Sequence, residues 1–142
     1  MESKEKKKID NIMLDKKRLL NSFKYAGQGV YEAYLGEQNL KIHTIIGVLV
    51  IIFGFLFKIS YVEWLVCLVL IGLVIMAEFF NTALEYVVDL ASPEIHPLAK
   101  MAKDTASAGV LMMAIISAVI GLVIFVPKIM LFVGGLLWKI NY

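Results

Sequence analysis

The sequence predicts an all-α integral membrane protein, with an N-terminal amphipathic surface helix followed by three transmembrane helices. Two observations support this fold class. The chain of 142 residues is 60% hydrophobic and has a mean hydropathy of +0.79, a composition that is typical of membrane proteins when it comes with long apolar runs. The helical period of the apolar residues also continues across the expected membrane boundaries. The length allows one compact domain.

The N-terminal segment is expected to lie at the membrane surface. Residues 1–11 are rich in Lys and Glu and have few apolar anchors, which predicts a disordered basic tail. Over about 12–35, apolar residues recur at steps of three and four with charged residues between them. This pattern favours an amphipathic helix on the membrane, although a helix packed on a soluble partner would share it. Gly36 is expected to end the helix.

Three apolar segments are expected to cross the membrane. The first, over about 42–57, extends ~24 Å at 1.5 Å per residue, and interfacial flanking residues would complete a ~30 Å hydrocarbon core. The second runs over about 62–88 and the third over about 106–125. Together with the surface helix, these spans would form one membrane domain over 12–126.

Prolines are expected to separate these segments. Pro93 and Pro97 predict a short loop after the second span. Pro127 is expected to close the third span, because proline interrupts the helical hydrogen bonds. Residues 127–142 would then be an interfacial C-terminal segment, too short to span the membrane again and anchored by Trp138.

Positive charge gathers in the first 41 residues, which hold nine of the fourteen Lys and Arg residues. Because positive charge near membrane spans collects on the cytoplasmic side, we expect the N-terminus and the loop over 90–104 in the cytoplasm. The net charge of +2 is too small to suggest a nucleic-acid partner.

One face of the second span becomes acidic near its end. Glu78, Asn81, Glu85 and Asp89 share a stripe ~80° wide, since successive helical residues are ~100° apart. Carboxylates in or beside a membrane are costly, and they mark ion binding, proton transfer or chemistry. Fourteen uncharged residues precede Glu78, which places it near the cytoplasmic interface.

The depth of these groups suggests different roles. At the hydrocarbon edge, Glu78 could accept a proton from a hydroxyl group. Glu85, closer to water, suits a hard cation such as Mg²⁺, and Glu37 could be a second ligand. Lys103 and Asp104 add a cation that would offset phosphate charge and another acid.

Structural roles are open for the same residues. Glu78 and Asn81 could join two helices by hydrogen bonding, and Glu85 and Asp89 could form a solvated helix end that faces basic residues. Glu37 could be a surface charge. Three further residues have simple structural explanations, namely an interfacial histidine, a flanking polar residue and a packed thiol: His43, Asn39 and Cys67.

A longer pattern is more specific than any of these residues. The sequence has no Walker A, protein-kinase or Rossmann glycine motif. The runs AEFFNTALEYVVD over 77–89, HPLAKMAKD over 96–104 and SAGV over 107–110 resemble the prokaryotic diacylglycerol kinase family. The resemblance extends over about 18–125. The run EQNLKIH over 37–43 is similar to the version in Gram-positive bacteria, whose members are often undecaprenol kinases.

The resemblance implies a lipid kinase that uses ATP and Mg²⁺ in the bacterial cytoplasmic membrane. It would be a homotrimer with sites built between protomers on the cytoplasmic side. The expected reaction converts undecaprenol to undecaprenyl phosphate, which recycles a lipid carrier of the cell envelope. Conversion of diacylglycerol to phosphatidic acid is the alternative.

The resemblance also implies roles for individual residues. Glu78 matches the general base, and Asn81 matches a catalytic asparagine beside it. Glu37 and Glu85 match metal ligands, and Ser107 joins Glu78 in contacting the lipid. The family's residues that contact ATP match a larger set, which includes the two metal ligands: Arg18, Glu37, Glu85, Asp89, Glu94, Ile95, His96, Lys103 and Asp104.

Two functions of other classes compete with a kinase. A small proton-coupled transporter could use Glu78, but it would need an isolated carboxylate near mid-membrane rather than a cluster at one interface. A non-catalytic assembly protein could use the polar stripe for packing alone.

Overall fold

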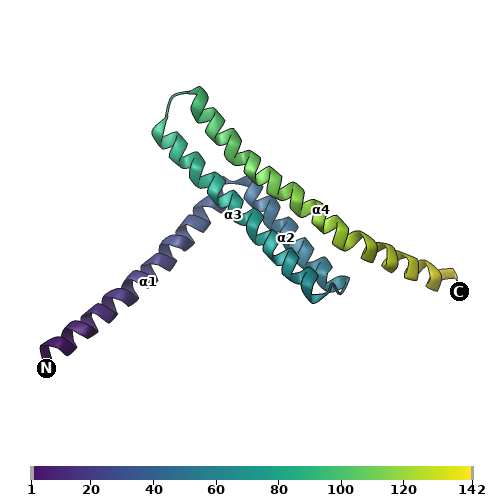
Figure 1. Cartoon of the computed structure of the whole chain (residues 1–142), viewed down its shortest axis with the longest axis horizontal. Coiled ribbons are helices and arrows are strands. Elements are labelled where there is room, and N and C mark those ends of the chain that lie inside the picture. The colour runs from purple at the N-terminus through teal and green to yellow at the C-terminus, as the bar shows by residue number, and fades with distance from the viewer. Residues whose placement is uncertain (1, 142) are drawn as a thin grey trace. The chain divides into compact units, whose positions relative to one another are not determined.

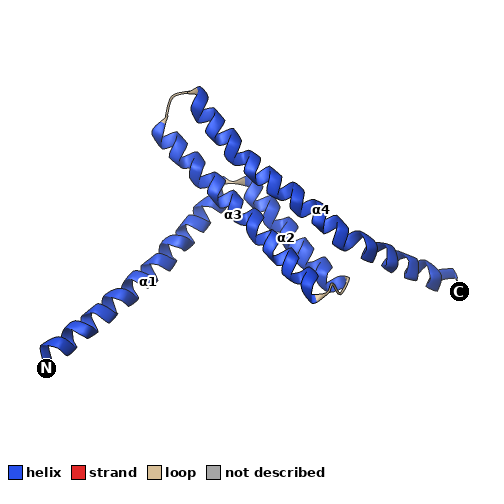
Figure 2. Cartoon of the chain, in the orientation of Figure 1, coloured by secondary structure: helices blue, strands red, loops and turns tan. Residues whose placement is uncertain are grey.

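The computed structural model is all-helical, with the helices in the order α1, α2, α3 and α4 (Figure 1, Figure 2). It describes residues 2–141, and their side chains over 15–135. The predicted all-α class is therefore confirmed for these residues. The helices have the bounds Glu2–Gly36, Gln38–Leu56, Tyr61–Ala91 and Pro97–Asn141. The chain divides into two units, one holding α1 and the other α2, α3 and α4.

In the second unit, α3 is the central helix, because both α2 and α4 pack mainly on it. Figure 1 shows α3 and α4 running antiparallel and joined by the loop over 92–96. Helices α2, α3 and α4 are each long and apolar enough to cross a membrane, which confirms the predicted number of spans. Most large apolar side chains on these helices are exposed, as expected where lipid tails rather than water surround the protein.

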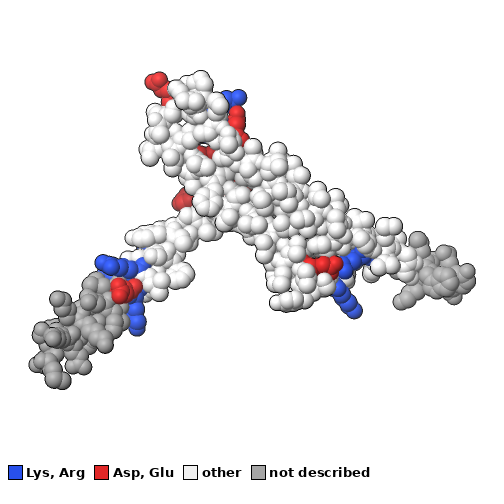
Figure 3. Space-filling view, in the orientation of Figure 1, with Lys and Arg blue, Asp and Glu red and all other residues white. Residues whose placement is uncertain are grey.

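Charged side chains gather at the two ends of α3, with a broad uncharged band between them (Figure 3). At the end opposite the α3–α4 loop, Lys128 Nζ lies 3.1 Å from Glu63 Oε2. At the loop end, Lys103 pairs with Asp89. The uncharged band is the part of the unit suited to the hydrocarbon core.

The turn between α2 and α3 is fixed by two local motifs. Lys58 adopts the left-handed conformation, with φ of 51°, and the amide groups of Lys58 and Ile59 donate to the carbonyl groups of Phe55 and Gly54. This is the Schellman arrangement that ends a helix. Helix α3 then begins with a capping box, in which Ser60 and Glu63 each accept from the other's amide group.

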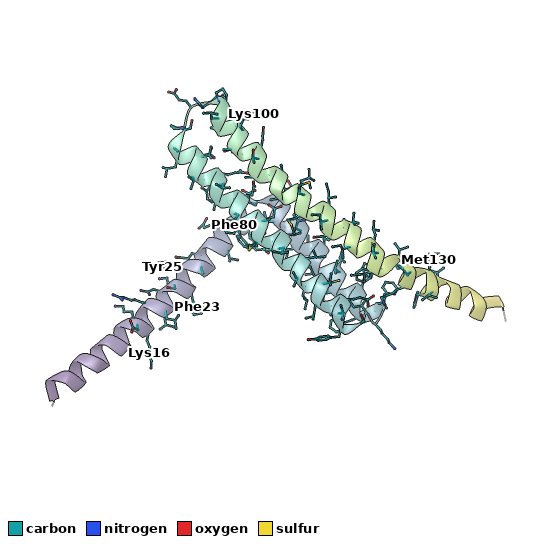
Figure 4. The ribbon with its side chains drawn as sticks, in the orientation of Figure 1. Lys16, Phe23, Tyr25, Phe80, Lys100 and Met130 are labelled. Atoms are coloured by element: carbon teal, nitrogen blue, oxygen red, sulfur yellow. The ribbon has the colours of Figure 1, made fainter. Side chains whose placement is uncertain are left out.

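Helix α1 forms the first unit and extends further than expected. It begins at Glu2, so residues 2–11, predicted to be a disordered tail, are helical. Lysine and glutamate have high intrinsic helix propensity. Lys16, Phe23 and Tyr25 project from α1 (Figure 4), and the two aromatic side chains are 71% and 65% exposed. Its place on the membrane surface stays a prediction.

The prediction that Pro127 closes the third span is wrong. Helix α4 continues through Pro127 to Asn141. Proline is tolerated in a membrane helix because neighbouring groups can satisfy the backbone groups that it leaves without a helical hydrogen bond. Contacts beyond the proline also hold the helix in place. Lys128 pairs with Glu63 of α3, and the Phe132 ring lies 5.7 Å from that of Phe57. The predicted anchor, the Trp138 side chain, lies outside the described side chains.

Close packing of α2 on the start of α3 generates a prediction. A Cβ atom at Gly54 would lie 2.7 Å from Trp64 Cη2 and 2.9 Å from Trp64 Cζ2. Overpacking of this kind costs about 1–3 kcal/mol, more than the ~1 kcal/mol that alanine gains in a helix. We therefore expect Gly54→Ala to lower the thermal midpoint of the detergent-solubilised protein.

The matched control is Gly134→Ala in α4, because a Cβ atom there would meet nothing within 4 Å. Its midpoint should stay the same or rise slightly. Equal midpoints for the two variants would contradict the close approach of Trp64 to α2.

Candidate active site

A cavity of about 520 Å³ lies among α2, α3 and α4. Four predicted site residues line it: Glu78 and Asn81 from α3, and Asp104 and Ser107 from α4. Asn39 and His43 of α2 form another part of the wall. Residues that are distant in sequence therefore meet around one polar space, at the membrane end that carries the α3–α4 loop.

Glu78 is the most deeply buried charged residue of the described side chains, with 1% of its surface exposed. Its Oε1 lies 3.2 Å from His43 Nε2, but no donor in the described residues is aligned to form a hydrogen bond with that oxygen. The Thr82 hydroxyl donates to the Glu78 carbonyl at 3.0 Å, so it supports the backbone and not the carboxylate. A buried carboxylate oxygen is thus left to accept a hydrogen bond from a ligand.

Asn81 is hydrogen-bonded to one carboxylate of the stripe, that of Glu85. Its Nδ2 donates to Glu85 Oε1 at 2.9 Å, along α3 and not across to another helix. Its own Oδ1 is buried and has no donor among the described residues. Since Asn81 lines the cavity, that oxygen is a second acceptor open to a ligand.

Basic residues lie beside the stripe at the loop end. Lys103 Nζ of α4 is 2.5 Å from Asp89 Oδ1 of α3, and Lys100 Nζ is 3.6 Å from Asp104 Oδ2 one turn away. Lys100 stands at the loop end of α4 (Figure 4). The Asp89–Lys103 contact fits the structural alternative of a solvated helix end, and it also holds a cation close to the acidic stripe.

The two predicted metal ligands, Glu37 and Glu85, suit a cation that is also bound by oxygen atoms of water and phosphate. Glu37 precedes α2 directly and, like Glu85, is half-buried, and neither of them lines the cavity that holds Glu78. No three acidic, His or Cys side chains over 15–135 form a cage for a metal. Mg²⁺ needs no such cage, because it is commonly held by one or two carboxylates, phosphate oxygens and water. The residues therefore fit Mg²⁺ carried by a nucleotide.

The other predicted ATP contacts lie outside the cavity wall. Glu94 and Ile95 are exposed in the α3–α4 loop, where the Ser92 hydroxyl donates to the Glu94 carbonyl. His96 caps α4, because its Nδ1 accepts from the Leu98 amide at 3.2 Å. Arg18 is exposed on α1, and its role stays a prediction.

Two polar residues of the cavity wall are not predicted as site residues from the sequence. The sequence favours a flanking residue at Asn39 and an interfacial histidine at His43, yet both line the cavity. Their spacing of four residues, which places them on one face of α2, was the available signal. This spacing does not predict which face of α3 Asn39 and His43 meet.

A second cavity of about 580 Å³ continues from the first along the apolar parts of α2, α3 and α4. The two cavities share His43 and Ala114. The wall of the second is formed almost wholly by apolar side chains, from Ile46 and Val74 to Phe125. The two cavities thus share part of their walls at His43, whose Nε2 lies 3.2 Å from Glu78 Oε1.

Comparison with known proteins decides which family has this arrangement. A sequence model of the family described as prokaryotic diacylglycerol kinase matches residues 24–125. The chain belongs to this family. It is therefore a lipid kinase, with ATP as its co-substrate and three apolar helices suited to a membrane.

Individual relatives support the same conclusion. The chain is 44% identical over 112 residues to the undecaprenol kinase of Bacillus subtilis, a match that covers 79% of this chain and 91% of the relative. It is 40% identical over 113 residues to a diacylglycerol kinase of Synechocystis, covering 79% and 65% of the two chains. It is 30% identical over 103 residues to the diacylglycerol kinase of Escherichia coli K12, covering 72% and 84%.

The Lys103–Asp89 contact generates a prediction about stability. The two side chains are 34% and 64% exposed, and an exposed ion pair contributes no more than about 1 kcal/mol. Lys103→Gln should therefore shift the thermal midpoint by only a few degrees (~2–8 °C), as should the control Lys100→Gln. A large loss of stability in Lys103→Gln alone would show that the contact is structural.

Proposed function

We propose that the protein transfers the γ-phosphoryl group of ATP to the hydroxyl group of undecaprenol, giving undecaprenyl phosphate. The buried Glu78 carboxylate carries the proposal, because its Oε1 lacks an aligned donor and Glu78 lines a polar cavity that shares His43 with an apolar one. Undecaprenol is preferred to diacylglycerol because the relative that is 44% identical is named undecaprenol kinase. Diacylglycerol is the second candidate substrate.

The paired cavities suit a substrate with an apolar tail and one polar end. The apolar cavity would receive part of the tail, and the hydroxyl group would reach Glu78 and Ser107 in the polar cavity. Ser107 contributes a hydroxyl that can donate to or accept from the lipid. A lipid in this position would fill the buried region without leaving the membrane.

In the proposed reaction, Glu78 takes the proton of the lipid hydroxyl. The lipid oxygen forms a bond to the γ-phosphorus, and the bond to the β,γ-bridging oxygen breaks. The electron pair of that bond leaves with ADP. Phosphoryl transfer depends mainly on positioning and charge stabilisation, and Asn81 would position the reacting groups through its free Oδ1.

Glu37 and Glu85 would hold Mg²⁺ together with the ATP phosphates. When bound, the ion would offset the negative charge of the phosphates. Asn81 would orient Glu85 by donating to its Oε1. Lys103 would exchange Asp89 for phosphate oxygens, which is possible because the pair is partly exposed.

The remaining ATP contacts are proposed from the family pattern. The α3–α4 loop is exposed and lies at the same end as Lys103, which supports contacts with the nucleotide beyond the phosphates. The full proposed set is Arg18, Glu37, Glu85, Asp89, Glu94, Ile95, His96, Lys103 and Asp104.

We also propose a homotrimer in the bacterial cytoplasmic membrane, with α1 on the cytoplasmic surface and a membrane domain over 12–126. The concentration of Lys and Arg in the first 41 residues supports this orientation. Side chains of α3 alone surround a hollow between Gly72 and Ala83, and the exposed Phe80 borders it (Figure 4). A helix of a neighbouring protomer would cover this face.

Activity on a panel of lipids tests the proposed function. Purified protein with labelled ATP should phosphorylate undecaprenol with a higher kcat/KM than diacylglycerol. Glu78→Gln should lower kcat by about 10²–10⁴-fold and leave ATP binding largely intact, because Glu78 faces the lipid side. Absence of any lipid product from the parent protein would refute the kinase, and full activity of Glu78→Gln would refute the base.

Removal of one metal ligand tests the role of Glu85. Glu85→Gln keeps an oxygen that can accept from Asn81 but removes the negative charge. We expect it to weaken the Mg²⁺-dependent part of ATP binding, measured by titration at several Mg²⁺ concentrations. The control is Glu63→Gln, at the other end of α3. Equal Mg²⁺ dependence in all three proteins would exclude Glu85 from the metal site.

A further inference from the structure

One contact of the site has no role in the proposed function. His43 Nε2 of α2 lies 3.2 Å from Glu78 Oε1 of α3. We propose that His43 is a positioning residue, which donates from Nε2 to the Glu78 carboxylate and so aims it at the lipid hydroxyl. This inference rests on the proposed role of Glu78 as the base.

The burial of the two side chains supports this role. Glu78 is 1% exposed, whereas the His43 side chain is 21% exposed and lines both cavities. His43 therefore stands where the polar cavity meets the apolar one. Glu78 Oε1 has no aligned donor among the described residues. A hydrogen bond donated by His43 would therefore restrict the rotation of the Glu78 carboxylate.

Asn39 and Ser107 share the cavity, but neither forms a hydrogen bond with Glu78 Oε1. The other polar groups near Glu78 donate elsewhere or are acids. Thr82 donates to the Glu78 carbonyl, and Asn81 donates to Glu85. The remaining titratable groups that act on Glu78 or share its cavity are acids, namely Glu37, Glu85 and Asp104. An ionised carboxylate cannot donate a hydrogen bond. Among the side chains described over 15–135, His43 is thus the donor recorded within ion-pair distance of this carboxylate.

The His43–Glu78 contact also joins α2 to α3, so the position of α2 affects the position of the carboxylate. Leu40, one turn before His43, is fully buried, so it fixes the first turn of α2. Hydrogen bonds of a catalytic site are commonly long or poorly aligned without substrate and tighten when it binds. The distance of 3.2 Å without an aligned bond fits such a site, and a lipid hydroxyl that approaches Oε1 would complete it.

Substitution of His43 by glutamine and by asparagine tests the proposal, because the two amide side chains differ in length. The amide nitrogen of glutamine can reach the position of Nε2, whereas that of asparagine is one carbon shorter and cannot. We expect His43→Asn to lower kcat on the order of 10²-fold, the loss that follows from a misplaced catalytic group. His43→Gln should recover most of that loss. KM for ATP and for the lipid should stay close to the parent values in both variants.

Chemical rescue and a neighbouring control sharpen the test. Added imidazole should raise the turnover of His43→Ala but not that of Glu78→Gln. Thr44→Val is the matched control, because the Thr44 hydroxyl donates to the Leu40 carbonyl within α2, and it should keep the parent activity. Retained ATP binding would show that each variant is folded.

Three results would overturn the proposal: parent-like kcat in His43→Asn, equal losses in the Gln and Asn variants without rescue by imidazole, or a loss confined to the lipid KM. These results differ from a failure of the proposed function. If the parent phosphorylates no lipid, or if Glu78→Gln is fully active, the base itself is wrong. If Glu78→Gln is inactive while His43→Asn is active, only the role of His43 is wrong.

Discussion

The structure depends on the burial of one carboxylate in a helix that is long enough to cross a membrane. Glu78 is almost inaccessible, and a buried charge is tolerated only with partners that offset its desolvation. Two other helices supply those surroundings, because α2 contributes His43 and α4 contributes the opposite wall of the cavity. The close packing of α2 on α3 at Gly47 and Gly54 therefore bears directly on the site, since it holds His43 against Glu78.

The far end of the bundle keeps the polar stripe at the correct depth. Glu63 takes part in the cap of α3 and also pairs with Lys128 of α4. One carboxylate thus fixes where α3 begins and how α4 lies along it. From that end, uncharged residues lead to Glu78, so the register set at Glu63 determines how far the stripe stands from the opposite membrane surface.

Sequence reasoning predicted the features that depend on local pattern. The three apolar spans and the shared face of Glu78, Asn81 and Glu85 follow from composition and a period of 3.6 residues. It failed where a contact between helices decides the outcome. Pro127 does not end α4, because groups on α2 and α3 hold the helix beyond it. The position of His43 likewise depends on which face of α3 it meets, and a single sequence carries no signal for that pairing.

The site also explains how a small protein without a phosphate-binding loop could use ATP. In a loop of that kind, backbone amide groups hold the phosphates. Here the described residues offer side-chain groups that are separated along α3: a buried acceptor at Glu78, a linked carboxylate at Glu85 and an ion-paired lysine near Asp89. In the proposed reaction, the lipid would place its tail in the apolar cavity and its hydroxyl group beside Glu78, with the phosphates of ATP on the side of Glu85. An alcohol that is already in the membrane would then reach Glu78 from the apolar side.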